Sequence, residues 1–394
     1  MRKVVTIGDL GEVITGKTPP KSNKNFYGDY AVFIKPTDIS EDHKYTYETE
    51  EMYSQLAAEQ YKSSLVPKGA ICVPCIGTIG TKMTMTHCAC YTNQSINSIV
   101  CNDNYDNEYV YYLIKNFLPG LKAYNLGTAS GREYVSKSNF ELIEIEVEQD
   151  KETQHRIATI LSRYDSLIEN YQKQIKLLEE AAQRLYKEWF IDLRFPGYEN
   201  ANIVDGVPEG WERKSVGQIG EYLNGFAFKP SDWQETGKPI IKIKEMGNGV
   251  TNDTPRNNGE RVPVKYLIKA GDLLFSWSAT LMVIIWSGEE GWLNQHLFKV
   301  TPANGISREF LLQSISNTIV EFQNLTTGST MKHIQRNKLD QVFVNVPNAK
   351  IMKRYADISE KTRSSILSLQ SQLRLLTEAR DRLLPKLMSG AIEV

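Results

Sequence analysis

The sequence predicts an α+β protein in which two globular domains alternate with two long antiparallel coiled-coil helices, as a pseudo-twofold internal repeat. Three observations predict this architecture. A long ladder of apolar residues follows a first region of mixed strand and helix signals, a second ladder returns 198 positions later, and the regions before the two ladders also match each other. An apolar ladder with alternating steps of four and three residues is typical of a helix that pairs with another helix.

The first ladder runs through residues 154–189 and predicts a long central helix over residues 150–191. An ordinary core-facing helix is the alternative explanation of such a pattern, but this ladder extends well beyond three heptads. Its positions are Ile157, Leu161, Tyr164, Ile168, Tyr171, Ile175, Leu178, Ala182, Leu185 and Trp189.

The second ladder predicts a long C-terminal helix and tail over residues 348–394. Its positions are Tyr355, Ser359, Thr362, Ile366, Leu369, Leu373, Leu376, Arg380, Leu383 and Leu387. Because Ser359, Thr362 and Arg380 are not apolar, we expect the seam to be looser there or to face a partner. We expect the helix–helix interface to consist of Ile157, Leu161, Tyr164, Ile168, Tyr171, Ile175, Leu178, Leu185, Trp189, Ile366, Leu369, Leu373, Leu376, Leu383 and Leu387.

The regions before the ladders predict two globular domains, residues 1–149 and residues 207–347. In each, short β-branched and aromatic runs alternate with turns around one helical stretch. The two regions match each other at several glycines and at an Asn-Gln pair, residues 93–94 in the first and 294–295 in the second, as expected for a duplicated unit. Turn-forming residues between 192 and 206, among them a Pro-Gly dipeptide, predict a connector.

The short connector determines how the parts are expected to lie. It places the second domain near the C-terminal end of the first helix, so the second helix must run back along the first for the two apolar seams to meet. The two domains then lie at opposite ends of a stiff rod of about 54 Å, because roughly 36 residues rise 1.5 Å each. Such an arrangement suits a target with two separated parts.

Composition favours a protein of the reducing cytoplasm. All five cysteines lie within residues 72–101, and this odd number does not suggest a disulfide framework. We find no run long enough for a signal peptide or a membrane-spanning helix, so no membrane partner is expected. The formal net charge of −1 excludes a global basic field, so any binding of nucleic acid must come from local patches.

Two motifs suggest chemistry, and their context argues against both. Residues 11–18 match the Walker A pattern, but Pro19 and Pro20 follow where a phosphate loop continues into a helix. The cysteines at 72, 75, 88 and 90 are numerous enough to hold zinc. Small buried cysteines are the favoured interpretation, because the second repeat has Leu274 and Trp277 in this neighbourhood. We expect no catalytic, cofactor or metal site in this chain.

Two polar loops are better candidates for function. Residues 15–28 carry three lysines and residues 327–338 carry two lysines, an arginine and a histidine, and neither loop contains an acid. Cationic side chains contact phosphates, while Asn, Ser and Thr pair with base edges, so both loops fit duplex DNA. A merely solvated loop is the alternative explanation for either segment taken alone.

These residues, in this order, resemble the specificity subunits of Type I restriction-modification enzymes. The resemblance covers essentially the whole chain. It rests on the twofold repeat, the two Asn-Gln pairs and the segments Gly16-Lys-Thr-Pro19, Phe33-Ile-Lys-Pro-Thr-Asp-Ile39, Gly206-Val-Pro-Glu-Gly-Trp211, Thr327-Gly-Ser-Thr330 and Arg382-Leu-Leu-Pro-Lys-Leu-Met-Ser-Gly390. It implies two target recognition domains, each reading one half of a split DNA sequence, and helices that separate these domains and dock two methyltransferase subunits.

The resemblance also implies what the chain works with. Double-stranded DNA, two methyltransferase (modification) subunits and restriction/translocase subunits are the expected partners, and the chain itself is expected to be non-catalytic. S-adenosylmethionine, ATP and Mg²⁺ are expected on the partner subunits. The candidate DNA-binding residues are Lys17, Thr18, Lys21, Asn23, Lys35, Thr37, Ser130, Arg132, Lys229, Ser231, Lys242, Lys244, Thr330, Lys332, His333 and Arg336.

Two alternative functions stay open at this point. A stand-alone bipartite DNA-binding regulator with the same repeat would bind its site without restriction-modification partners. A nucleotide-dependent enzyme would bind or hydrolyse ATP by itself. Co-purification with a methyltransferase distinguishes the specificity subunit from both.

Overall fold

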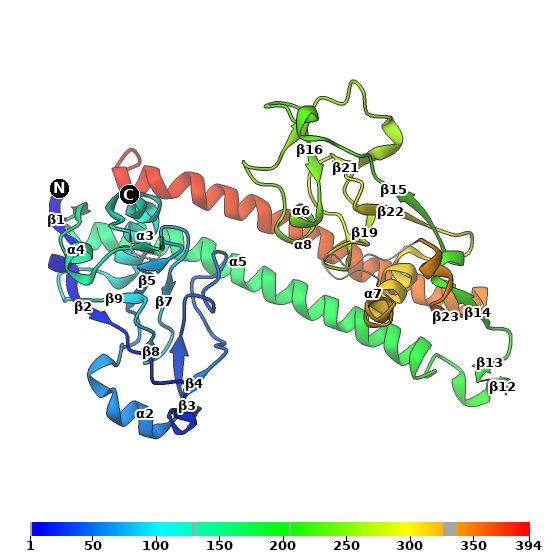
Figure 1. The fold of residues 1–394 in the computed structure, drawn as a ribbon, viewed down its shortest axis with the longest axis horizontal. Helices are drawn as coiled ribbons and strands as arrows, with labels where there is room; N and C mark the ends of the chain where they lie inside the picture. Colours follow the sequence, from blue (N-terminus) through cyan, green and yellow to red (C-terminus); the bar gives the residue numbers. More distant parts are fainter. Residues whose placement is uncertain (1, 128–130, 205, 326–335) are drawn as a thin grey trace. The chain divides into compact units, whose positions relative to one another are not determined.

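The computed structural model describes residues 2–127, 131–204, 206–325 and 336–394 (Figure 1). It divides into two compact units. Unit 1 comprises Met1–Gln172 with Leu373–Val394, and unit 2 comprises Lys173–Gln372. Each unit therefore contains one globular region together with a segment of each long helix. The domain boundaries expected from the sequence, which treat the helices as separate segments, stay a prediction.

Unit 1 is built on two small sheets with two accessory strand pairs. The four-stranded sheet has the order β2 (Gly11–Thr15), β9 (Ile96–Cys101), β5 (Ile71–Pro74), β7 (Thr84–Met85). The three-stranded sheet has the order β4 (Met52–Tyr53), β3 (Tyr27–Ile34), β8 (Tyr91–Thr92). The pairs are β1 (Arg2–Thr6) with β11 (Glu144–Glu148) and β6 (Ile76–Gly77) with β10 (Glu133–Tyr134). The helices are α1 (Ile7–Leu10), α2 (Gln55–Gln60), α3 (Asn107–Phe117) and α4 (Lys137–Glu141).

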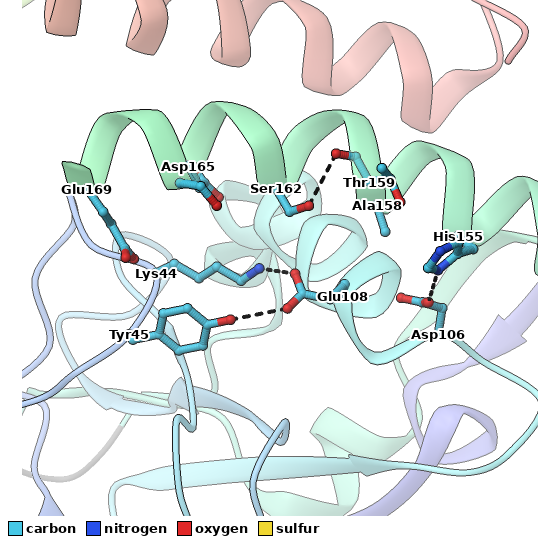
Figure 2. A pocket seen from close by; sticks show the side chains of 11 residues that line it. Lys44, Tyr45, Asp106, Glu108, His155, Ala158, Thr159, Ser162, Asp165 and Glu169 are labelled. Carbon is cyan, nitrogen blue, oxygen red and sulfur yellow. Dashed lines mark hydrogen bonds and ion pairs between the residues drawn. The ribbon is translucent and has the colours of Figure 1, made fainter. Parts of the chain in front are cut away.

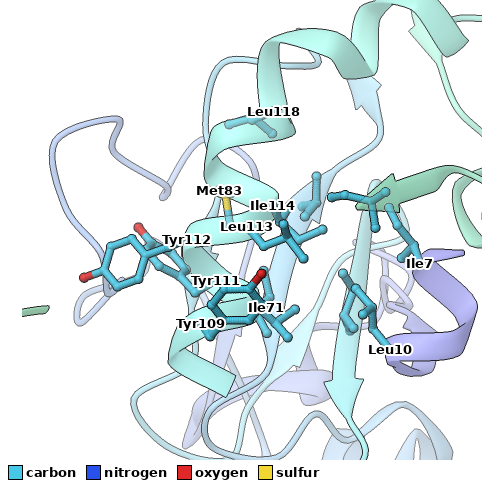
Figure 3. Packing of buried hydrophobic residues seen from close by; sticks show 14 of the residues in the cluster. Ile7, Leu10, Ile71, Met83, Tyr109, Tyr111, Tyr112, Leu113, Ile114 and Leu118 are labelled. Carbon is cyan, nitrogen blue, oxygen red and sulfur yellow. The ribbon is translucent and has the colours of Figure 1, made fainter. Parts of the chain in front are cut away.

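Helix α3 is the centre of the core of unit 1. The side chain of Asp106 accepts a hydrogen bond from Tyr109 N and so caps the helix at its start. Every residue from Tyr109 to Ile114 is buried in a cluster that also contains Ile71, Ile7 and Leu10. In Figure 3, Tyr111 and Tyr112 project to the side of the helix that faces away from Ile7 and Leu10. A helix buried on all sides is stabilised mainly by packing against its neighbours. The same cluster includes Leu161 and Leu387, so both long helices contribute to this core.

Unit 2 repeats this plan. Its first sheet has the order β15 (Gly220–Asn224), β22 (Leu297–Pro302), β19 (Leu273–Ser276), β20 (Met282–Ile285). Its second sheet has the order β17 (Arg256–Asn257), β16 (Lys238–Ile241), β21 (Gly291–Leu293), β18 (Leu267–Ile268). The pairs are β14 (Glu212–Ser215) with β23 (Phe343–Val346) and β12 (Ile203–Val204) with β13 (Val207–Pro208). The helices of the globular region are α6 (Ile243–Asn248) and α7 (Arg308–Asn324).

The internal repeat expected from the sequence is confirmed at the level of strand register. In the first sheet of each unit, the corresponding strands follow one another in the same order and pair antiparallel. In the second sheet, one pair is parallel in both units: Phe33 lies opposite Tyr91 in unit 1, and Ile240 lies opposite Trp292 in unit 2. A parallel pair in an otherwise antiparallel arrangement, found twice at matching positions, is strong evidence of duplication.

Both long helices are present where the ladders predict them. Helix α5 runs from Lys151 to Tyr186 and continues into a π-helical turn, Lys187–Ile191, while α8 runs from Ala349 to Ser389. In unit 1 the first half of α5 lies in the same core as the last turns of α8, and in unit 2 the end of α5 lies in the same core as the start of α8. Within each unit the helices therefore run antiparallel, as expected. The rod length and the position of the domains at its two ends stay predictions.

The predicted interface residues avoid solvent. None of them is exposed; six are buried, namely Ile157, Leu161, Ile168, Trp189, Ile366 and Leu387, and the others are half-buried. The expectation of a loose seam at Arg380 is wrong. Its guanidinium is buried and lies 2.8 Å from the carboxylate of Asp165, which also accepts a hydrogen bond of 2.6 Å from the Tyr112 hydroxyl. A charge at an apolar position is tolerated here because a second buried charge neutralises it.

Candidate nucleic-acid interface

A tight glycine turn begins the same loop in both units. Gly16 follows β2; its N–H donates to Ile96 O at 3.2 Å, and the next N–H, of Lys17, donates to Thr92 O at 2.9 Å. Gly225 follows β15 and forms the matching bonds to Leu297 O (3.0 Å), with Phe226 N–H donating to Leu293 O (2.9 Å). A Cβ atom at either glycine would overlap with a carbonyl oxygen of the neighbouring chain segment. Both loops therefore leave the sheet by a turn that only glycine permits.

This requirement makes Gly225→Ala a test of the loop. The added methyl group must push apart two backbone segments, so we expect a loss of about 1–3 kcal/mol in the free energy of unfolding. All six tryptophans lie between residues 189 and 292, within unit 2, so their fluorescence during urea unfolding reports on this unit. The matched control is Gly247→Ala in α6, where the nearest atom is 3.9 Å from the new Cβ. Equal urea midpoints for Gly225→Ala and Gly247→Ala would contradict the requirement for glycine at the start of the loop.

The first loop is fixed to the core of unit 1 by two tyrosines. Tyr53 OH donates to Lys17 O at 2.6 Å, and Tyr27 OH donates to Pro19 O at 2.8 Å. The Tyr53 ring is buried and stacks on Tyr91 with a centroid distance of 4.6 Å. Because the loop backbone is held in this way, the side chains that it carries project from a defined surface. Segment 11–15, which begins the Walker A match, is a paired strand and not a phosphate-binding loop.

The candidate residues of the first loop lie close together, but they differ in exposure and in hydrogen bonding within the protein. Lys17 is exposed, and its ammonium lies 3.4 Å from Ser63 Oγ. Thr18 is half-buried and donates a hydrogen bond to the side chain of Gln94. Lys21 is exposed, whereas the side chain of Asn23 accepts from Asn25 N and caps a short 3-10 turn. The exposed cations Lys17 and Lys21, together with Lys24 of the same loop, are therefore able to meet a phosphate.

Lys35 and Thr37 lie after strand β3, and the first of them already has partners. The Lys35 ammonium lies 2.6 Å from Glu50 and 3.0 Å from Glu51. Burial opposes the charged form, but the hydrogen bonds to both glutamates outweigh it and raise the pKa of Lys35. Its charge is thus neutralised within the protein, which weakens its case as a phosphate contact. Thr37 is exposed.

In unit 2 one candidate residue contacts an exposed tryptophan. The Lys242 ammonium lies over the ring of Trp233 at 4.6 Å from its centroid, and the candidates Lys229, Ser231 and Lys244 are exposed. Trp233 itself is 48% exposed and so presents a large aromatic surface. Aromatic and cationic groups in this combination suit contact with nucleic acid. The sequence offered no periodic signal for Trp233, because it lies in an irregular loop.

The remaining candidates lie at or beyond the limits of the described segments. Arg132 and Arg336 are exposed. Ser130, Thr330, Lys332 and His333 lie outside the described residues, as does most of the second basic loop. Their role in DNA binding stays a prediction.

The structure also contains a cavity that the sequence did not predict. It occupies about 350 Å³ in unit 1 between residues 44–45, the start of α3 and α5. Figure 2 shows the Lys44 ammonium and the Tyr45 hydroxyl directed at the carboxylate of Glu108. Burial lowers the pKa of Lys44 to about 8, while Asp165 and Glu169 act in the opposite direction. The charged groups of this cavity pair largely with one another and attach the globular region to α5.

The cysteines give no sign of a metal centre in the part of the chain that the structure describes. No group of three or more His, Cys, Asp or Glu side chains is placed there to hold a metal ion. Cys72, Cys75 and Cys90 are buried, and burial raises the pKa of the Cys72 thiol to about 12. A thiol that stays protonated is a poor metal ligand.

Comparison with known proteins identifies the family to which the chain belongs. The sequence profile of the family described as "Type I restriction modification DNA specificity domain" matches residues 2–180 and 208–374, one match for each repeat. The chain belongs to this family. The expectation of a specificity chain, and not of a catalytic subunit, is therefore confirmed.

Individual relatives of this specificity chain agree with the family assignment. The Type I restriction enzyme MjaIX specificity subunit of Methanocaldococcus jannaschii is 27% identical, over 99% of this chain and 93% of its own length. The HindI specificity subunit of Haemophilus influenzae is 39% identical, over 35% of this chain and 30% of its own length. The crystal structure of a Type I restriction-modification system S subunit from M. genitalium has a TM-score of 0.57 at 16% identity, covering 98% of this chain and 96% of that one. That structure supports the fold assignment.

The described helices of this specificity chain include none with the length and apolar character needed to cross a membrane. This finding agrees with the amphipathic pattern of α5 and α8, whose outward faces carry many charged residues.

Proposed function

We propose that this chain reads a bipartite DNA site, with the globular region of each unit contacting one half. The observation that carries the proposal is that one strand framework occurs twice and holds different side chains in its loops. Lys17 and Thr18 follow the glycine turn in unit 1, whereas Phe226 and Ala227 follow it in unit 2. A shared framework with different loop residues suits two readers of the same type of ligand with different sequence preferences.

We propose further that the long helices dock two methyltransferase subunits and, through them, restriction subunits. Apolar side chains on their outward faces support this: Leu177 is 63% exposed, Leu375 56% and Ile358 47%. Exposed apolar side chains on these helices are available for contact with other proteins. The partner subunits would contribute S-adenosylmethionine, ATP and Mg²⁺, and the assembly would work on DNA in the cytoplasm.

The net charge agrees with such partners. DNA affinity comes largely from neutralised phosphates, and in this chain 46 lysines and arginines are offset by 47 aspartates and glutamates, which gives a formal net charge of −1. Additional cationic surface from docked subunits would provide the missing contacts.

Exchange of one globular region tests the proposed function. Replacing residues 1–149 with the corresponding region of another specificity subunit should change one half of the methylated sequence and leave the other half unchanged. Methylation-sensitive sequencing of cells that carry the chimera measures this, and the unaltered second half is the internal control. A change in both halves would contradict independent reading. If the chain purifies without a methyltransferase and still binds its site tightly, it is a stand-alone regulator.

A further inference from the structure

The Asn-Gln pair of each unit forms the same turn, fixed by the same backbone hydrogen bonds. Asn93 N donates to Ile34 O at 3.0 Å, at the end of the parallel neighbouring strand. Asn294 N makes the equivalent bond to Ile241 O at 3.1 Å. In both units the asparagine carbonyl then accepts the N–H three residues further on, at 3.1 Å in unit 1 and 3.0 Å in unit 2. The turn is therefore a duplicated feature with one geometry.

The two asparagines have a clear structural task. Their side-chain oxygens accept the N–H two residues further on, from Ser95 at 3.0 Å and from His296 at 3.3 Å. Asn294 is buried and Asn93 is half-buried. An asparagine that closes its own turn needs no ligand to explain its presence.

The two glutamines have no comparable task. Gln94 is exposed, and its only hydrogen bond among the described residues is accepted from Thr18, which leaves both of its amide N–H donors available. Gln295 is half-buried, and its amide nitrogen lies 3.4 Å from the ring of His296, the next residue in the chain. Neither side chain closes the turn that carries it. A residue that recurs at this position without a structural role points to something outside the protein.

The position of the glutamines in each unit indicates which ligand group they contact. Each turn contacts the start of the glycine loop of its own unit, where Gly225 and Phe226 in unit 2 correspond to Gly16 and Lys17 in unit 1. The residues that follow these glycines differ between the units, as two different half-sites require. The sugar–phosphate backbone is the part of DNA that is the same in any two half-sites, so a side chain that recurs in both units suits a contact with it.

On the basis of the proposed function, we infer that Gln94 and Gln295 each donate a side-chain amide hydrogen bond to a phosphate of their own half-site. Neutral amides are common phosphate contacts and carry no sequence information themselves. Because both turns are rigid, the two contacts fix the position of each unit on the duplex. The loop residues then read the bases from that position.

Charge substitution in the assembled complex tests this inference. The complex with its methyltransferase subunits is titrated with a duplex that carries the methylated sequence and with duplexes altered in one half. We expect Gln94→Glu, which replaces two donors with a negative charge of the same shape, to raise the Kd about tenfold or more on every duplex. Gln295→Glu should do the same, and the double variant should approach the product of the two factors.

A neutral variant and a matched control complete the experiment. Gln94→Met keeps the length of the side chain but has no donor, so the Kd should rise about three- to tenfold without a change in its dependence on salt, because no counterion contact is lost. Gln149→Glu makes the same change at an exposed glutamine outside the turns and should not alter the Kd.

Three results have distinct meanings. Unchanged affinity in Gln94→Glu and Gln295→Glu would overturn the inference. A loss that depends on the bases of one half would also overturn it, since the glutamine would then read sequence. If the wild-type complex fails to prefer the methylated sequence over the altered duplexes, the proposed function itself is wrong.

Discussion

Arg380→Met is expected to destabilise unit 1 by about 3–5 kcal/mol. The Arg380 and Asp165 side chains are 8% and 6% exposed and lie 2.8 Å apart. Removing the guanidinium leaves the carboxylate of Asp165 buried without its cation, and the Tyr112 hydroxyl alone cannot neutralise it. Hydrogen exchange at the amides of α3 measures the loss in unit 1, whereas tryptophan fluorescence reports only on unit 2.

Two further variants separate the charge effect from a general effect of shortening the side chain. Arg382→Met removes an exposed cation that pairs with Glu378 one helical turn away, and should change stability by less than about 0.5 kcal/mol. Asp165→Asn combined with Arg380→Met removes both charges and keeps an acceptor for Tyr112. The double variant should therefore be more stable than Arg380→Met alone. Equal losses in Arg380→Met and Arg382→Met would show that the buried pair has no such role.

Arg363→Asp is expected to destabilise unit 2 at least as strongly, by about 3–5 kcal/mol. Arg363 and Asp165 occupy equivalent positions in the two copies of the long helix, so this variant introduces the residue of the first repeat. In unit 2, however, Arg363 Nε lies 3.0 Å from Glu309, which is 1% exposed. The substitution would bury two carboxylates side by side.

Tryptophan fluorescence during urea unfolding measures this effect directly, since all six tryptophans lie in unit 2. Lys361→Asp, at an exposed position half a turn away on the same helix, is the matched control and should have little effect. A mild loss in Arg363→Asp, comparable with that of Lys361→Asp, would contradict the expected penalty for two neighbouring buried carboxylates.

The apolar pattern predicted the framework, because its spacing directly reflects which side faces the core. The ladders through Ile157 and Tyr355 gave α5 and α8, and the matching glycines gave the duplicated sheets. The environment of charged residues was harder to predict, since a charged residue looks the same in sequence whether it contacts water or a distant side chain. Arg380 meets Asp165 from a position 215 residues away, so no local pattern could show that both are buried.

The candidate interface was predictable only in part for the same reason. The lack of acids in residues 15–28 correctly indicated exposed lysines at 17 and 21. Lys35 looked equally available, but Glu50 and Glu51 fold back onto it. The recurring glutamines were visible in the repeat, yet only the hydrogen bonds of the turn showed that the asparagine of each pair has a structural role and the glutamine does not.

The two copies share an apolar framework, but their buried charges differ. Each globular region therefore matches the charge of only one helix segment. Glu108 and Glu309 stand at equivalent places in α3 and α7; the first pairs with Lys44 close to Asp165, and the second pairs with Arg363. A globular region placed on the other copy's helix segment would bury Glu309 against Asp165, or Lys44 against Arg363. During folding, these contacts between like charges would disfavour the packing of either globular region on the helix segment of the other copy.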